Sequence, residues 1–143
     1  MNKRMKIAFL CHFLAVLIVS SFGIIYLFRS EFMPYHSAAI GLKWAELTPS
    51  FQILLLALMK ATGASCFAVG IYTVILLFIP FRRGEVWPRW AIPSGGLVVC
   101  AGVLYATLIV AFNTPSKPPW IAPVVGAILL LTGLFLSLGK ANG

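Results

Sequence analysis

Acidic residues are the scarcest chemical class in this sequence: Asp and Glu together number 3, against 11 Lys and Arg. Charged residues of both signs make up only 10% of the 143 residues, whereas hydrophobic residues make up 61%. A chain of this size cannot bury so much apolar surface in a water-soluble core. The shortage of charge therefore excludes a soluble globular protein and predicts an integral membrane protein.

Cysteine and histidine are also few, with 3 and 2 copies. Cys11, Cys66 and Cys100 each lie inside an apolar run, and no two of them form a Cys-x-x-Cys pair, so neither a redox motif nor a thiolate metal site is predicted. The chain also lacks a Gly-rich phosphate loop, a Ser/His/Asp set and a paired-carboxylate site. We expect no metal and no cofactor, and no nucleic-acid partner, since the basic residues flank apolar runs.

Long uncharged runs are what the sequence has in abundance. A hydrocarbon layer about 30 Å thick requires about 20 residues of helix, and four runs are long enough. The first follows three basic residues as a signal sequence would, but it is too long for a signal-peptide core, so we interpret it as an uncleaved helix. The predicted spans cover residues 7–28, 51–80, 91–112 and 120–138.

The positive charges predict which way round the protein lies. Four spans place both termini on one side of the membrane. Positive residues accumulate on the cytoplasmic side. The count is seven against three, which predicts a bacterial inner-membrane protein with both termini in the cytoplasm. The seven are Lys3, Arg4, Lys6, Arg82, Arg83, Arg89 and Lys140, and the three are Arg29, Lys43 and Lys117.

The second apolar run is longer than one crossing requires. Counting about 1.5 Å per residue back from Arg82, a helix has crossed the hydrocarbon layer near residues 61–62, which places Lys60 near the outer boundary. Residues 51–59 are nevertheless apolar and need a cover, which the preceding loop, residues 29–48, can supply as a short interfacial helix. We therefore predict one all-α domain, an integral membrane four-helix bundle with a short extracytoplasmic cap between its first two spans.

Glycine spacing predicts how the spans pack. In lipid, close approach at small residues holds helices together. Spans two, three and four each carry two glycines seven residues apart, a spacing that keeps both on one seam of a left-handed bundle. The pairs are Gly63 and Gly70, Gly95 and Gly102, and Gly126 and Gly133, whereas Gly23 in the first span has no such partner.

The polar residues of the outer side gather between residues 31 and 60. Lys60 is the one charge inside an apolar run, so we expect it to pair with Glu46 or Glu31, to snorkel, or to contact a ligand. His36 follows Pro34, which favours a helix start there, and a lone His is expected to hydrogen-bond or cap more readily than to bind metal. The candidate ligand-binding set is Tyr35, His36, Trp44, Glu46, Gln52 and Lys60.

A distinctive set of residues lies within residues 32–90. It comprises Phe32, Met33, Pro34, Tyr35, His36, Gly41, Trp44, Glu46, Leu47, Pro49, Gln52, the run 54–60 and the run 80–85. On these residues the chain resembles a group of small bacterial inner-membrane proteins with no assigned activity. In architecture alone, the overall plan is also similar to the broader DoxX-like four-helix membrane proteins, some of which are implied to work beside quinone-linked oxidoreductases.

Three functions are consistent with these features. The favoured one is a noncatalytic multi-pass protein whose outer face binds a lipid, a quinone or a membrane-protein partner. The alternative is a small membrane enzyme or oxidoreductase-associated subunit in which Lys60 or His36 acts as an acid or base on a lipophilic substrate. A transporter is less favoured, because one intramembrane charge provides no pathway unless the protein forms an oligomer.

Overall fold

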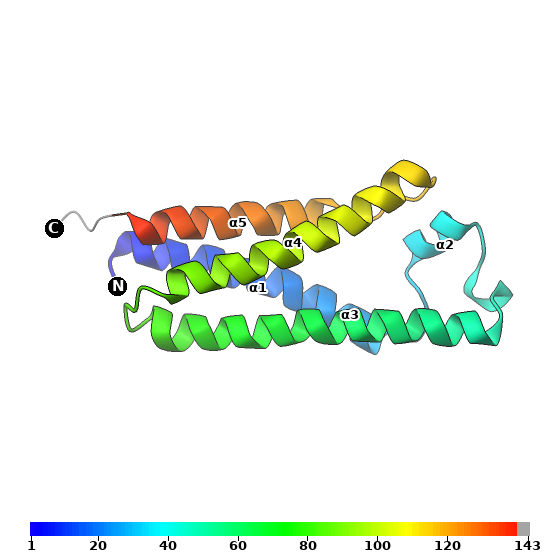
Figure 1. Cartoon of the computed structure of the whole chain (residues 1–143), viewed down its shortest axis with the longest axis horizontal. Helices are drawn as coiled ribbons and strands as arrows, with labels where there is room; N and C mark the ends of the chain where they lie inside the picture. Colours follow the sequence, from blue (N-terminus) through cyan, green and yellow to red (C-terminus); the bar gives the residue numbers. More distant parts are fainter. Residues whose placement is uncertain (140–143) are drawn as a thin grey trace.

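The protein is an elongated bundle of four long helices with a short helical cap at one end, as the computed structural model shows (Figure 1). The structure describes residues 1–139, so Lys140, one of the cations counted for orientation, lies outside the described residues. The elements are α1 (Lys3–Phe28), α2 (Pro34–Ile40), η1 (Trp44–Glu46), α3 (Pro49–Leu76), η2 (Leu77–Phe81), α4 (Pro88–Asn113) and α5 (Ile121–Leu138).

The four-span prediction is confirmed. The helices Lys3–Phe28, Pro49–Phe81, Pro88–Asn113 and Ile121–Leu138 are each long and apolar enough to cross a membrane, and each contains or nearly matches its predicted span. The second combines α3 with η2, a π-helical turn that accommodates Pro80, whose ring cannot fit a regular helix interior. The chain is therefore a multi-pass α-helical membrane protein.

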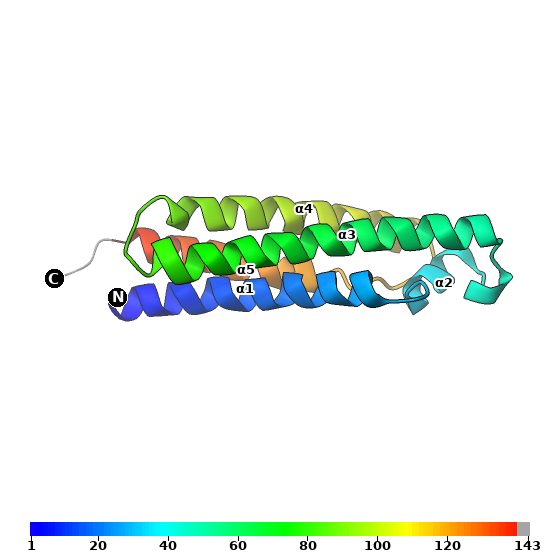
Figure 2. The ribbon, with the colours of Figure 1, turned by 90° about the horizontal axis from the view of Figure 1, so that it is seen from below.

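The two ends of the bundle differ. We call the end where α1 begins and α5 finishes the terminal end, and the opposite end, which carries α2 and η1, the cap end (Figure 1). A cluster centred on Ala8, Val16, Leu77 and Phe81 forms the core near the terminal end. Figure 2 shows α1 and α3 running side by side from the terminal end toward the cap.

Glycines set the closest helix crossing, though at positions the heptad pattern only partly identified. A Cβ on Gly23 would lie 2.7 Å from the backbone nitrogen of Phe67, and one on Gly63 would lie 2.6 Å from that of Leu27, so α1 and α3 meet backbone to backbone. Gly70, Gly126 and Gly133 also face neighbouring side chains. The prediction for Gly95 and Gly102 is wrong, because nothing lies within 4 Å of either position.

The predicted cap is present, and it covers one side of α3. Met33 is extended before Pro34, as expected, and Gly41 ends α2 at a φ of 70°, a left-handed conformation that glycine adopts without strain. The part of α3 before Lys60 projects about 16 Å at the helical rise of 1.5 Å per residue. The cap buries Met59 to 5% exposure, but Ile53 on another side of α3 remains 71% exposed.

Candidate functional site

An aromatic cluster holds the cap against the bundle. Tyr26 from α1, Phe32 from the following loop and Met59 from α3 are buried together, and Trp44 of η1 packs against them. The rings of Phe32 and Trp44 meet edge to face with centroids 5.1 Å apart, a favourable aromatic geometry. The cap is therefore a packed part of the structure.

A chain of hydrogen bonds runs through this cluster. The backbone N–H of Met33 donates to Nδ1 of His36 at 3.3 Å, which caps α2 and leaves the ring proton of a neutral imidazole on Nε2. Nε2 lies 3.4 Å from the hydroxyl of Tyr26, which is in turn hydrogen-bonded to the hydroxyl of Tyr35. We call His36, Tyr26 and Tyr35 the relay.

Burial favours the neutral forms of the two relay residues that lie outside the spans. It lowers the pKa of His36 below the ordinary value, because charging the imidazole would cost desolvation energy. Burial likewise raises the pKa of Tyr35, and the hydrogen bond with Tyr26 offsets part of this increase. The relay therefore holds its protons at neutral pH and can only donate and accept hydrogen bonds there.

The loop between α4 and α5 is tied to the cap. Ser116, which is buried, donates its hydroxyl hydrogen to the backbone carbonyl of Tyr35 at 2.5 Å. This bond joins residues 81 positions apart in the sequence. It ties the loop that contains Pro119 to α2, whose Tyr35 belongs to the relay.

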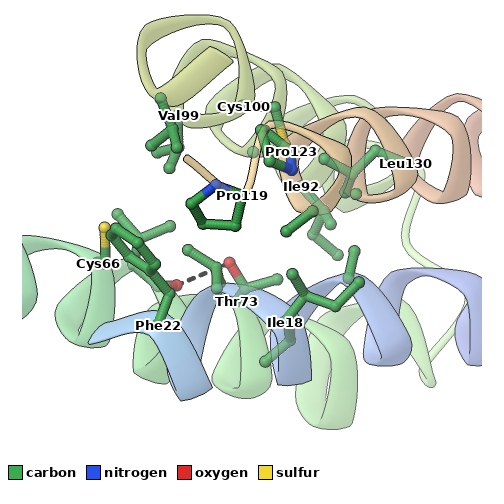
Figure 3. Close-up of a pocket in the computed structure, with 18 of the residues that line it drawn as sticks. Ile18, Phe22, Cys66, Thr73, Ile92, Val99, Cys100, Pro119, Pro123 and Leu130 are labelled. Carbon is green, nitrogen blue, oxygen red and sulfur yellow. Dashed lines mark hydrogen bonds between the residues drawn. The ribbon is translucent and has the colours of Figure 1, made fainter. Parts of the chain in front are cut away.

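Below the cap lies an apolar crevice (Figure 3). It holds about 790 Å³ of empty space, its open side included. Along α4 it extends from Ile92 to Thr107, about 22 Å at the helical rise. All four long helices line it, with Ala15, Val16, Ile18, Val19, Phe22, Cys66, Val69, Thr73, Ile92, Gly96, Val99, Cys100, Val103, Thr107, Pro119, Ala122, Pro123, Gly126 and Leu130.

The walls of the crevice offer almost nothing polar to a ligand. The hydroxyl of Thr73 donates to the carbonyl of Val69 at 2.8 Å, and that of Thr107 donates to the carbonyl of Val103 at 2.9 Å. Both hydroxyl protons are therefore used within their own helices. The sulfur atoms of Cys66 and Cys100 are weak hydrogen-bonding groups, so the crevice suits a hydrocarbon chain.

The crevice exists because two helices diverge. α4 packs along α5, and α1 packs along both α3 and α5. α3 and α4 are joined by the short turn at the terminal end and separate steadily toward the cap end (Figure 1). Gly95 and Gly102 of α4 face open space, so neither glycine forms a close packing contact with α3.

The predicted site residues are only partly brought together. Tyr35, His36 and Trp44 share the cap cluster, and Gln52 supports it by donating to the backbone carbonyl of Trp44 at 2.9 Å. Glu46 accepts a hydrogen bond from the backbone nitrogen of Lys43 at 2.6 Å, closing the turn of η1. These contacts show structural roles in the cap.

Lys60 does not pair with a carboxylate. Its Nζ donates to the backbone carbonyl of Leu27 at 3.0 Å, and the expected ion pair with Glu46 or Glu31 is not formed in the described structure. The last carbonyls of a helix lack partners within the helix, and a cation there also complements the helix dipole. Lys60 is thus an exposed side chain that caps α1.

Sequence reasoning missed Phe22 and Tyr26, although both lie on α1 one turn apart. Their rings are 4.2 Å apart between centroids, and Phe22 lines the crevice while Tyr26 belongs to the relay. The spacing of four residues, which places two side chains on one helix face, is the signal that could have joined them.

Polar groups at the terminal end serve packing. His12 is fully buried, and a Cβ on Gly133 would lie 2.6 Å from its ring, so the imidazole fills the space between α1 and α5. Arg89 donates to the carbonyl of Ser137 at 3.0 Å and to that of Gly84 at 3.1 Å. Arg89 therefore joins the start of α4 to the last turn of α5. This structural role is additional to its place among the cations that predict the orientation.

Within residues 1–139, no group of three His, Cys, Asp or Glu side chains is placed to hold a metal ion. In comparisons with known proteins, no family model, no curated protein and no solved structure matches the chain. The crevice, the relay and their connection are therefore the features of the molecule that bear on its function.

Proposed function

We propose that this protein is a noncatalytic multi-pass membrane protein that takes up one hydrocarbon chain of a membrane lipid in the crevice between α3 and α4. The crevice carries the proposal. Its walls are apolar, its hydroxyl protons are already used, and it opens between two diverging helices that lie within the membrane. The molecules that surround such an opening are lipids, so the chain of a lipid is the occupant with direct access.

We also assign the protein a membrane and an orientation in it. We place the protein in the bacterial inner membrane with the terminal end in the cytoplasm and the cap end outside, from the excess of Lys and Arg at the terminal end. Lys60 caps α1 at the level where the helical rise counted back from Arg82 puts the outer boundary. A fluorescent reporter that matures only in the cytoplasm, fused after Gly143, is expected to be bright, and a dark fusion would reverse the orientation.

Lys60 and His36, the candidates for a catalytic acid or base, both make structural hydrogen bonds, which favours a binding protein over an enzyme. Lys60 is bonded to the carbonyl of Leu27, and Nδ1 of His36 accepts the backbone N–H of Met33. Each group contributes to the fold through the bond it makes. The resemblance to DoxX-like proteins and their quinone-linked partners remains a prediction. Like the lipid chain proposed for the crevice, a quinone is a lipophilic ligand.

Native mass spectrometry of the protein purified in mild detergent tests the binding proposal. We expect a peak for the protein with one lipid retained. The control is Val99→Trp, a variant whose crevice is filled by the new side chain, and we expect to detect it without bound lipid. A wild-type protein that carries no lipid under conditions that keep it folded would contradict the proposal.

A further inference from the structure

The relay has one hydroxyl proton that it does not use. The neutral imidazole of His36 supplies one N–H, and Tyr26 and Tyr35 supply one O–H each, which makes three donors. Two hydrogen bonds connect the three groups, so two of these donors are used. Since no other bond from either hydroxyl is formed within residues 1–139, one phenolic O–H is left to donate elsewhere.

The relay stands at the cap end of the crevice. Phe22 lines the crevice, and its ring packs on that of Tyr26 one helical turn nearer the cap. From the other side, Ser116 holds the backbone of Tyr35, and Pro119, three residues later, lines the crevice. The relay therefore adjoins the cap end of the crevice through Phe22 on one side and Pro119 on the other.

The depth of the relay is also appropriate for a lipid head. Tyr26 lies one residue before Leu27, whose carbonyl receives Lys60, so the phenol and the ammonium share one level of the bundle. Tyrosine and lysine are the residues that typically occupy the boundary between hydrocarbon and polar headgroups. The oxygens of glycerol esters and phosphates lie at this boundary.

We propose that the relay selects the ligand, which is a glycerophospholipid whose ester or phosphate oxygen accepts the free hydroxyl proton of the Tyr26–Tyr35 pair. This inference rests on the proposed function, since it assumes that a chain occupies the crevice. The ligand must then carry an acceptor oxygen at the end of its hydrocarbon chain that lies nearest the cap. Donation to a charged phosphate is the stronger form of this bond.

Two photoreactive probes of equal chain length separate the two proposals. One is phosphatidylglycerol with a diazirine in one acyl chain, and the other is an alkane with a diazirine at the matching carbon. Each is added to vesicles that contain the full-length protein, and labelled residues are mapped by mass spectrometry. We compare the wild type with Tyr26→Phe/Tyr35→Phe and with the control Tyr72→Phe/Tyr105→Phe, whose two tyrosines are 68% and 70% exposed and do not line the crevice.

We expect both probes to label the crevice of the wild type and of the control. In Tyr26→Phe/Tyr35→Phe, phosphatidylglycerol labelling should fall about threefold to tenfold, the value of one lost hydrogen bond, while alkane labelling stays unchanged. Equal labelling by phosphatidylglycerol in all three proteins would overturn the relay as a selector but leave the proposed function intact. Failure of both probes to label the wild-type crevice would overturn the proposed function itself.

A third probe identifies the acceptor. An ether-linked phosphatidylglycerol keeps the phosphate but has no ester carbonyl. If it labels the wild type as strongly as the ester lipid and loses labelling in Tyr26→Phe/Tyr35→Phe, the phosphate oxygen is the acceptor. If it labels the wild type only as weakly as the ester lipid labels that variant, the ester carbonyl is the acceptor. Both results support a hydrogen bond from the relay to a lipid oxygen. Equally strong ether-lipid labelling of the wild type and of Tyr26→Phe/Tyr35→Phe would contradict it.

Discussion

Lys60 of α3 donates to the backbone carbonyl of Leu27 in the last turn of α1, at 3.0 Å. The bond joins the two helices just beyond the tight crossing at Gly23 and Gly63. A cation that is expensive inside a membrane here satisfies a carbonyl that its own helix cannot. This end of α1 is thus closed by α3, and the cap is built on top of it.

Replacement of Lys60 should affect stability and leave lipid binding unchanged. Lys60→Met removes the donor to Leu27 and is expected to lower the free energy of unfolding by about 0.5–1.5 kcal/mol, the usual value of one hydrogen bond. Lys60→Arg, which keeps a donor and the charge, should recover part of the loss. Equilibrium unfolding in mixed micelles measures both. Loss of crevice labelling in Lys60→Met would instead give Lys60 a role in ligand binding.

The glycine crossing predicts a sharp difference between helices. Gly23→Ala and Gly63→Ala each place a methyl group within 3 Å of backbone atoms, which cannot move aside as a side chain can. Each should cost about 1–3 kcal/mol, as overpacking does. The matched control is Gly102→Ala, where nothing lies within 4 Å, and it should be neutral or slightly stabilising. Equal effects at all three positions in unfolding measurements would contradict the assigned crossing.

Acid should loosen the cap through His36. Because burial lowers the pKa of His36 in the folded protein, the unfolded chain binds a proton more readily below its ordinary pKa of about 6.5. Cap stability is therefore full above that pH and falls as the pH decreases through the interval below it. Protonation of Nδ1 also breaks the bond from the Met33 N–H. Hydrogen exchange of residues 34–40, corrected for intrinsic rates, should quicken between pH 7.5 and pH 5.

The control for this pH effect is His36→Gln. Glutamine at this position of a helix accepts the same backbone N–H and does not titrate. Its exchange in residues 34–40 should remain nearly constant over the same pH range. An identical pH response in wild type and His36→Gln would show that another group controls the cap.

Arg89 should be the arginine of the 82–89 segment that matters most for stability. Arg89→Gln removes the charged donor to Ser137 and Gly84, and we expect a loss of about 1.5–3 kcal/mol, as for other hydrogen bonds from charged groups. Arg83→Gln is the control, because Arg83 is exposed and donates no such side-chain bond in the described structure. Comparable losses in the two variants would remove the assigned role of Arg89.

The spans and the cap could be predicted from sequence because they depend on properties that are local along the chain. Helix length against bilayer thickness located the spans, Pro34 located the start of α2, and the excess length before Lys60 predicted a cover. The cover is incomplete, since Phe51, Leu54 and Leu58 stay more than half exposed. Sequence length indicated that a cover was needed but could not indicate which side of α3 it would reach.

The crevice could not be predicted, for a physical reason. In a membrane protein, side chains facing lipid and side chains facing the bundle are both apolar. Val98 is 74% exposed and the neighbouring Val99 lines the crevice, yet no chemical contrast separates the two positions. The partner of Lys60 was missed for a related reason, because the free carbonyl of Leu27 becomes available only through the register of α1 against α3.

Photolabelling by the diazirine-bearing phosphatidylglycerol in vesicles tests lipid binding in the crevice most directly, with Val99→Trp compared against Val98→Trp. The two substitutions add the same bulk at adjacent positions of α4, but only the first fills the crevice. We expect label on Cys66 and Val103 in the wild type and in Val98→Trp, and a loss of about tenfold or more in Val99→Trp, since the indole occupies the site. Equal labelling of these residues in both variants would contradict lipid binding in the crevice.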